Sequence, residues 1–155
     1  MKNYILYFIF LLLTLIGCSK VIPAIFWEEF ESDKILSKSY DHGPWGGKTK
    51  ILWNSTDNYF IESNILKFAN KNKWTISDSL NVENGDIITS NQNHSIELIE
   101  NEKLISSDFR NGKIYIFETG LLSVKPGNST ETQKNGFILL NTKRNKMLMF
   151  SDWGE

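Results

Sequence analysis

The sequence predicts an α+β domain in which a mostly antiparallel β-sheet packs against one principal helix. Three observations support this fold class. Apolar residues recur at helical spacing in residues 58–72, short segments rich in β-branched and aromatic residues occupy most of the remaining chain, and Asn-Gly pairs separate some of these segments. The same pattern also allows an all-β barrel with a helical insertion.

The first half of the chain is expected to form two strands followed by the helix. The strand candidates are residues 34–40 and 49–53, and a cluster of Gly, Pro and Asp at 41–47 separates them. Residues 55–57 supply side-chain oxygens that can cap the helix that follows. The stripe that this helix would bury consists of Ile61, Ile65, Phe68 and Ala69.

The second half is expected to be β-rich. Asn84-Gly85 and Asn111-Gly112 are pairs typical of hairpin turns. The last two apolar segments, 137–140 and 147–150, predict a terminal hairpin whose near-continuous hydrophobicity indicates burial on both faces. The other strand candidates are residues 74–77, 86–90, 95–99, 103–107, 113–119 and 121–125.

Composition limits the classes of function. The 155 residues are the length of one domain, and 17 basic against 18 acidic residues give a net charge of −1. Such a balanced chain lacks the basic excess that binds nucleic acid. A single Cys excludes an intrachain disulfide framework and a Cys-rich metal site. We therefore expect no metal, no cofactor and no nucleic-acid partner.

The N-terminus predicts a secretory signal peptide. Lys2 is followed by the apolar run Tyr4–Ile16, which as a helix of about 1.5 Å rise per residue spans roughly 20 Å, against roughly 30 Å of bilayer hydrocarbon. A positive start and a short apolar run are typical of a signal peptide. An uncleaved N-terminal membrane anchor is the alternative.

The run ends in Leu15-Ile16-Gly17-Cys18, which resembles the lipobox of bacterial lipoprotein precursors. The resemblance implies cleavage between Gly17 and Cys18, a diacylglycerol on the Cys18 thiol, and an acyl chain such as palmitate on its amine. Ser19 is not the Asp associated with inner-membrane retention, so the resemblance favours the outer membrane, with the domain in the cell envelope. The expected organisation is a signal peptide at 1–17, a lipidated Cys and short tether at 18–24, and one globular domain at 25–155.

Because the tether is short, the first residues of the domain lie near the membrane. Phe26 and Trp27 either enter the lipid interface, where aromatic rings are favoured, or pack onto the domain as its first element.

The segment between the first two strands holds the candidate binding patch. Glycines allow a partner to approach the backbone closely, and Tyr and Trp provide contact area at low entropy cost. Trp45 could instead fold inward and fill the core. The predicted patch consists of Tyr40, His42, Trp45 and Lys48.

No motif for catalysis is found. The chain has no Gly-x-Ser-x-Gly elbow, no His-Glu-x-x-His and no Cys-x-x-Cys, so we assign no catalytic and no metal-ligating residue. These observations favour a membrane-anchored envelope lipoprotein that binds a protein or a glycan without catalysis, for example an inhibitor, an immunity protein or an assembly accessory. The alternative is an envelope hydrolase that uses His42 or His94 together with carboxylates.

Overall fold

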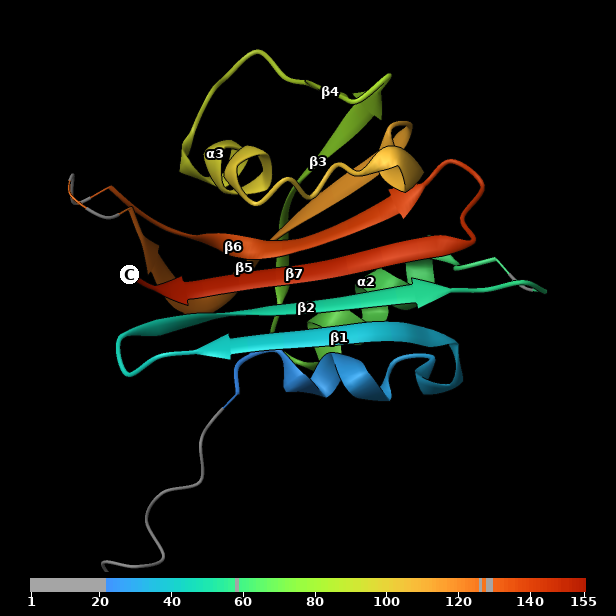
Figure 1. Cartoon of the computed structure of the whole chain (residues 1–155), viewed down its shortest axis with the longest axis horizontal. Coiled ribbons are helices and arrows are strands. Elements are labelled where there is room, and N and C mark those ends of the chain that lie inside the picture. The colour runs from blue at the N-terminus through green and yellow to red at the C-terminus, as the bar shows by residue number, and fades with distance from the viewer. Residues whose placement is uncertain (1–21, 58, 126, 128–129) are drawn as a thin grey trace, which may run out of the picture.

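The computed structural model describes residues 22–57, 59–125, 127 and 130–155. The expected signal peptide, Gly17, Cys18 and the first tether residues lie outside this range. Within it, the chain forms a twisted sheet with helical segments on both faces (Figure 1). In chain order the elements are η1 (Ile25–Glu29), η2 (Ser32–Lys34), β1 (Ile35–His42), β2 (Gly46–Asn54), α2 (Glu62–Lys71), β3 (Thr75–Glu83), β4 (Asp86–Ile88), α3 (His94–Asn101), η3 (Ser107–Phe109), β5 (Gly112–Val124), β6 (Glu131–Asn141) and β7 (Lys146–Gly154).

The sheet has seven strands in the order β1-β2-β7-β6-β5-β3-β4, and all of these neighbours are antiparallel. The predicted α+β class with a dominant antiparallel sheet is therefore confirmed. The sheet is open in the described chain, with β1 and β4 at its edges, whereas the barrel alternative requires closure.

The centre of the sheet agrees with the expected terminal hairpin. β6 and β7 pair through Phe137–Phe150 and Leu139–Leu148, and the apolar side chains of both strands are buried. Alternate residues point to opposite faces of a sheet. The near-continuous apolar runs arise because helical segments cover this hairpin on both sides. Asn84-Gly85 also forms its expected turn, between β3 and β4.

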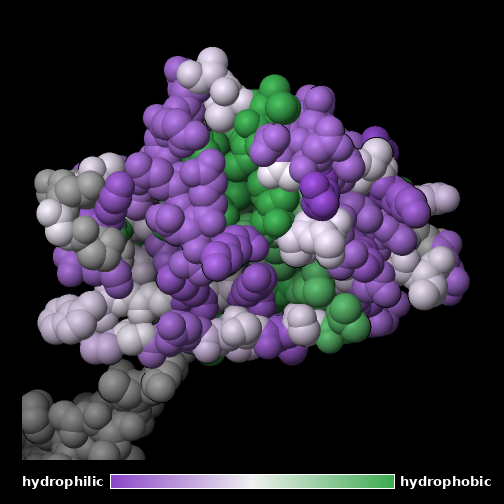
Figure 2. Space-filling view, turned by 45° about the horizontal axis from the view of Figure 1, so that its top comes forward, coloured by the Kyte–Doolittle hydropathy of each residue, from purple (hydrophilic) through white to green (hydrophobic). Residues whose placement is uncertain are grey.

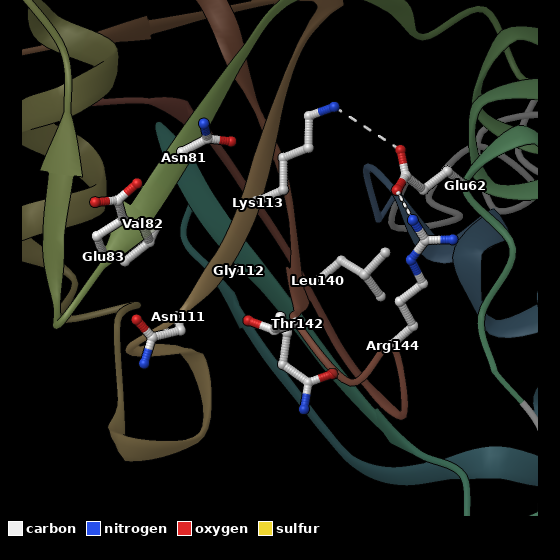
Figure 3. A pocket seen from close by; sticks show the side chains of 11 residues that line it. Glu62, Asn81, Val82, Glu83, Asn111, Gly112, Lys113, Leu140, Thr142 and Arg144 are labelled. Atoms are coloured by element: carbon white, nitrogen blue, oxygen red, sulfur yellow. Dashed lines mark ion pairs between the residues drawn. The ribbon is translucent and has the colours of Figure 1, made fainter.

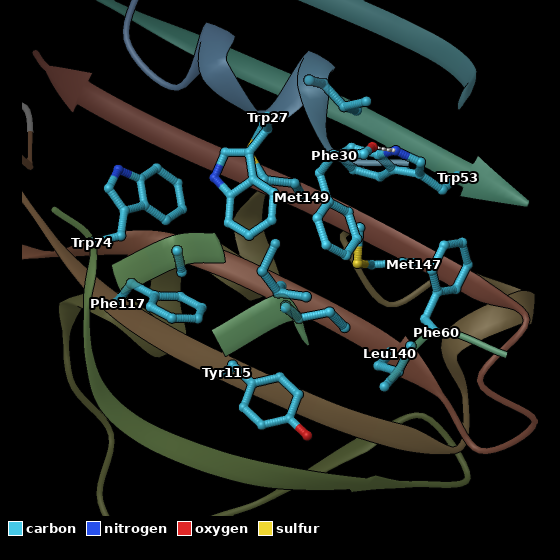
Figure 4. Close-up of a cluster of buried hydrophobic side chains, with 14 of the residues drawn as sticks. Trp27, Phe30, Trp53, Phe60, Trp74, Tyr115, Phe117, Leu140, Met147 and Met149 are labelled. Carbon is cyan, nitrogen blue, oxygen red and sulfur yellow. Dashed lines mark hydrogen bonds between the residues drawn. The ribbon is translucent and has the colours of Figure 1, made fainter. Parts of the chain in front are cut away.

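The first core lies between the sheet and the layer of η1 and α2, and is rich in aromatic rings (Figure 4). Trp27 is fully buried, with its ring centroid 5.1 Å from Phe68, 5.7 Å from Trp74 and 6.4 Å from Trp53. Trp27 therefore packs onto the domain and leaves no ring surface for a lipid interface. Phe26 is half-buried against the same core.

The principal helix begins later than predicted. α2 starts at Glu62, and its N-cap Ile61 is extended and 55% exposed, so Ile61 is not part of the buried stripe. Phe60 is the reason: its side chain is buried and its N–H donates to the Arg144 carbonyl. This attachment to the β6–β7 turn lies directly before the extended N-cap Ile61, whereas Ile65 and Ala69 are buried as expected.

The second core lies on the opposite face, under α3 and η3. The expected strand at 95–99 is wrong, because these residues belong to α3. The Asn93 side chain caps the helix by accepting the N–H of Ile96, and Ile96 and Ile99, one turn apart, are buried. The expected strand at 103–107 is also wrong, since those residues form a turn and the start of η3.

This second core is incompletely covered. α3 has only 8 residues, and hydrophobic side chains around it remain half-buried, namely Leu52, Leu80, Ile87, Leu98 and Ile105. Figure 2 shows hydrophobic surface between polar margins on a face that includes this side of the molecule.

Candidate functional site

The four residues of the predicted patch lie around the β1–β2 hairpin but do not share one surface. The register pairs Tyr40 with Thr49, Asp41 with Lys48 and His42 with Gly47. Because strand side chains alternate, Tyr40 and His42 point to the η1 face, whereas Lys48 points to the α3 face. Trp45 lies in the turn between them and is 80% exposed, so it does not fill the core.

Contacts within the domain occupy the η1 face of this hairpin. The Tyr40 hydroxyl donates to Glu28, whose carboxylate also accepts from Lys38 Nζ at 2.7 Å. Burial and the Glu28 carboxylate together raise the pKa of Tyr40. The His42 ring stacks on Tyr40 at 6.2 Å and lies 6.4 Å from the Trp153 ring. Tyr40 and His42 therefore hold η1 and the strand ends together.

The α3 face of the same hairpin end contains a cavity of about 530 Å³. Four segments far apart in the sequence enclose it: the β1–β2 hairpin, α3 and its C-cap, the residues that end β5, and the end of β7. The residues that matter for its chemistry are Trp45, Lys48, His94, Glu102, Lys125 and Asp152. Two residues of the predicted patch, Trp45 and Lys48, thus belong to one site.

Lys48 lies among carboxylates in this cavity. Its Nζ donates to Glu102 at 2.5 Å, and this bond is the main cause of its raised pKa, to which the charges of Asp152 and Asp41 also contribute. Asp152 is buried and accepts a hydrogen bond from Ser123. Burial raises the pKa of Asp152, because the ionised carboxylate loses solvation, and the Ser123 bond opposes this.

His94 opens α3 and lines the same cavity. Its side chain is only 7% exposed, and neither ring nitrogen makes a hydrogen bond. Nδ1 lies 3.6 Å from the Glu97 carboxylate, and Glu97 is itself bound by Lys125 at 2.7 Å. Buried polar atoms normally have a hydrogen-bond partner, and His94 shares the lack of one with His42 on the opposite face; only His94 lines this cavity.

Sequence reasoning missed Asp152 and Glu102. Both come from segments more than 50 residues away from Lys48, and neither lies in a motif. Their proximity depends on β2 pairing with β7, which sets Lys48 opposite Asp152, and on α3 packing over this end of the sheet.

The arrangement does not form a hydrolytic relay from the described residues. Ser123 is buried and donates to the Asp152 carboxylate, not to a histidine. A serine nucleophile needs a base that accepts its proton, and neither nitrogen of His94 is hydrogen-bonded. His42 is on the opposite face of the sheet and cannot assist.

A second cavity, of about 470 Å³, lies at the other end of the sheet (Figure 3). Most of its charged groups pair around Glu62. Glu62 accepts from the Tyr115 hydroxyl, forms an ion pair with Arg144 at 2.8 Å, and has Lys113 Nζ at 3.8 Å. Among the described residues, the cavity beside Trp45 differs because it contains a buried carboxylate, Asp152, with no directly bonded cation.

None of the helices in 22–57, 59–125 and 130–155 has both the length and the hydrophobicity needed to cross a membrane. In the same ranges, no group of three or more His, Cys, Asp and Glu side chains is arranged to hold a metal ion. Comparison of the chain with protein-family models, curated proteins and solved structures finds no match.

Proposed function

We propose that this chain is a binding module of the bacterial envelope, anchored by acyl chains on Cys18, which holds its ligand at the β1–β2 hairpin end without catalysis. The observation that carries the proposal is Trp45, which is 80% exposed beside a cavity lined by charged groups. Exposed Trp residues next to pockets are frequent energetic centres of interfaces.

The path of the chain into the domain supports the anchor. The Pro23 carbonyl accepts from Thr49 Oγ1 at 2.9 Å, which fixes this point beside β2. Pro23 follows Cys18 by five positions, so the connection reaches at most about 18 Å. An acylated Cys18 would therefore hold the domain close to the bilayer, with the outer membrane as the expected location.

The anchor is tested by expressing the full chain and its Cys18→Ser variant in a Gram-negative host with labelled palmitate. We expect label and membrane fractionation for the wild type, and loss of the label in Cys18→Ser. Label that persists in Cys18→Ser would contradict the lipobox assignment.

The binding site is tested by capturing partners from envelope and secreted extracts with the full chain in detergent. We expect one stoichiometric protein to be retained by the wild type and lost with Trp45→Ala. Tyr59→Ala is the matched control, because Tyr59 is also highly exposed, at 73%, but lies beyond the opposite end of β2. Equal retention by Trp45→Ala would show that the hairpin end is not the binding surface. No retention by either protein would count against a protein partner and lead to a glycan screen.

The second candidate is an envelope hydrolase that uses His94. One observation favours it: His94 and Asp152 line the same cavity. The absence of a hydrogen-bonded nucleophile–base pair among the residues described there makes binding the better-supported proposal. Turnover of an envelope ester or glycan that is lost in His94→Ala would reverse this preference.

A further inference from the structure

We propose that the cavity beside Trp45 accepts the guanidinium group of an arginine side chain from a protein partner. This inference rests on the proposed binding function and specifies the chemistry of the ligand. Three features of the cavity favour a guanidinium group: its charge, its buried groups and its exposed aromatic ring.

The charge of the cavity is unbalanced. Lys48 Nζ is bonded to Glu102 and lies within electrostatic reach of Asp152 and Asp41, so one ammonium faces three carboxylates. Lys125 also lines the cavity, but its charge is compensated by Glu97 at 2.7 Å. Glu155 adds a further carboxylate to the lining. Within the described residues, the site therefore has negative charge in excess, which favours a cationic ligand.

The buried groups indicate a ligand rather than a solvated acidic surface. Asp152 is only 9% exposed, and its hydrogen-bond partner Ser123 is a neutral hydroxyl, so a buried carboxylate lacks a directly bonded cation. The His94 side chain, 7% exposed, lines the same space; its Nδ1 lies 3.6 Å from the Glu97 carboxylate, and neither ring nitrogen makes a hydrogen bond. Buried charges in proteins are normally paired, and a ligand cation would supply the missing pair.

The exposed Trp45 ring favours a guanidinium group over other cations. An exposed indole face attracts a cation through its quadrupole, and arginine uses this contact more often than lysine because its planar group also stacks on the ring. Arginine can also donate two parallel hydrogen bonds to one carboxylate, which an ammonium cannot do. A cavity of about 530 Å³ accommodates the side chain and part of the adjoining backbone.

The test is a calorimetric titration of the full chain in detergent with blocked hexapeptides that carry arginine, lysine or citrulline at the same position. Citrulline keeps the shape of arginine but has no charge. We expect the arginine peptide to bind at least about tenfold more tightly than the citrulline peptide, and more tightly than the lysine peptide. Spermidine serves as a free cation without a guanidinium, and we expect it to bind more weakly than the arginine peptide.

The variants locate the site. Asp152→Asn and Trp45→Ala are each expected to weaken binding of the arginine peptide by about fivefold to tenfold. Asp41→Asn should act in the same direction, and because Asp41 is exposed this substitution does not endanger folding. Asp57→Asn is the matched control, since Asp57 is also exposed but lies beyond the other end of β2.

Two results would overturn the inference. The first is equal binding of the arginine and citrulline peptides, or no binding of the arginine peptide. The second is an equal loss in Asp57→Asn and Asp41→Asn, which would indicate general charge attraction and not this cavity. If a partner is captured in a Trp45-dependent manner while the arginine peptide does not bind, the proposed function stands and the guanidinium inference fails.

Discussion

Asp152 and Glu28 show how the environment of a single carboxyl determines its effect on stability. Burial raises the pKa of Asp152 above its ordinary value of 3.8, although the Ser123 bond opposes the rise. Hydrogen bonds from Lys38 and Tyr40 lower the pKa of Glu28 below its ordinary value of 4.5. The native chain therefore binds a proton at Asp152 more tightly, and at Glu28 less tightly, than the unfolded chain does.

These opposite shifts predict opposite pH dependences. For Asp152, the free energy of unfolding falls as the pH rises from about 3.8 through the raised native pKa, and the penalty is full above it. Asp152→Asn removes this effect, so its stability relative to the wild type should increase as the pH rises. Urea unfolding between about pH 3.5 and about pH 7 measures it.

Glu28→Gln is the control, because its effect on stability should change with pH in the opposite direction. The stabilisation from ionised Glu28 is present above pH 4.5 and is lost as the pH falls through the lowered native pKa. Relative to the wild type, Glu28→Gln should therefore lose stability as the pH rises. If the stability of both variants relative to the wild type changed in the same direction with pH, this would contradict the environments described for these carboxyls.

At the scale of elements, the β1–β2 hairpin has close backbone contacts at two of its glycines, Gly46 and Gly47. A Cβ on Gly47 would lie 2.3 Å from the Asp41 carbonyl oxygen and 2.8 Å from His42 Nδ1. At Gly43, in the turn, the nearest atom to an added Cβ is the Gly46 oxygen at 3.5 Å, an ordinary contact. Gly43 and Gly47 therefore have different roles in the same hairpin.

We expect Gly47→Ala to lower the free energy of unfolding by about 1–3 kcal/mol, because strand and ring must move apart. Gly43→Ala should change it by less than about 0.5 kcal/mol. Thermal unfolding of both variants measures the difference. Equal stability of the two would show that the hairpin adjusts without cost and would weaken its role as a rigid support for Trp45 and Lys48.

At the scale of the whole molecule, the five Trp residues differ widely in exposure. Trp27, Trp53 and Trp74 are buried in the core between the sheet and α2, and Trp153 is half-buried. Trp45 alone among them is highly exposed. Four indole rings thus pack wholly or partly within the fold, and one is exposed at the proposed binding end.

This distribution predicts the response of tryptophan fluorescence to iodide. Trp45→Phe should remove most of the emission that iodide quenches, because iodide reaches only rings that contact solvent. Trp53→Phe, a change within the core, should leave the quenchable emission nearly unchanged. Unaltered quenching in Trp45→Phe would show that this ring is covered in solution and would undermine the proposed site.

The sequence predicted those elements whose pattern is set by their own residues. The hairpin of β6 and β7 was foreseeable because an apolar run on both faces requires burial between two layers. α3 was not foreseen, since Ser95–Ile99 satisfies both strand and helix patterns over so short a length. Asn93, which caps the helix, was the local signal that distinguished them.

The sequence by itself determined the sheet-dominated α+β class, the central buried hairpin and the lipobox-like residues at Cys18. Only the tertiary structure decided which chemistry-bearing side chains meet. Tyr40 and His42 were separated from Lys48 by strand alternation, and Lys48 was joined to Asp152 by strand order and to Glu102 by the packing of α3. The physical reason is that local patterning fixes which face a side chain takes, whereas contacts across 50 or more residues depend on how the elements pack.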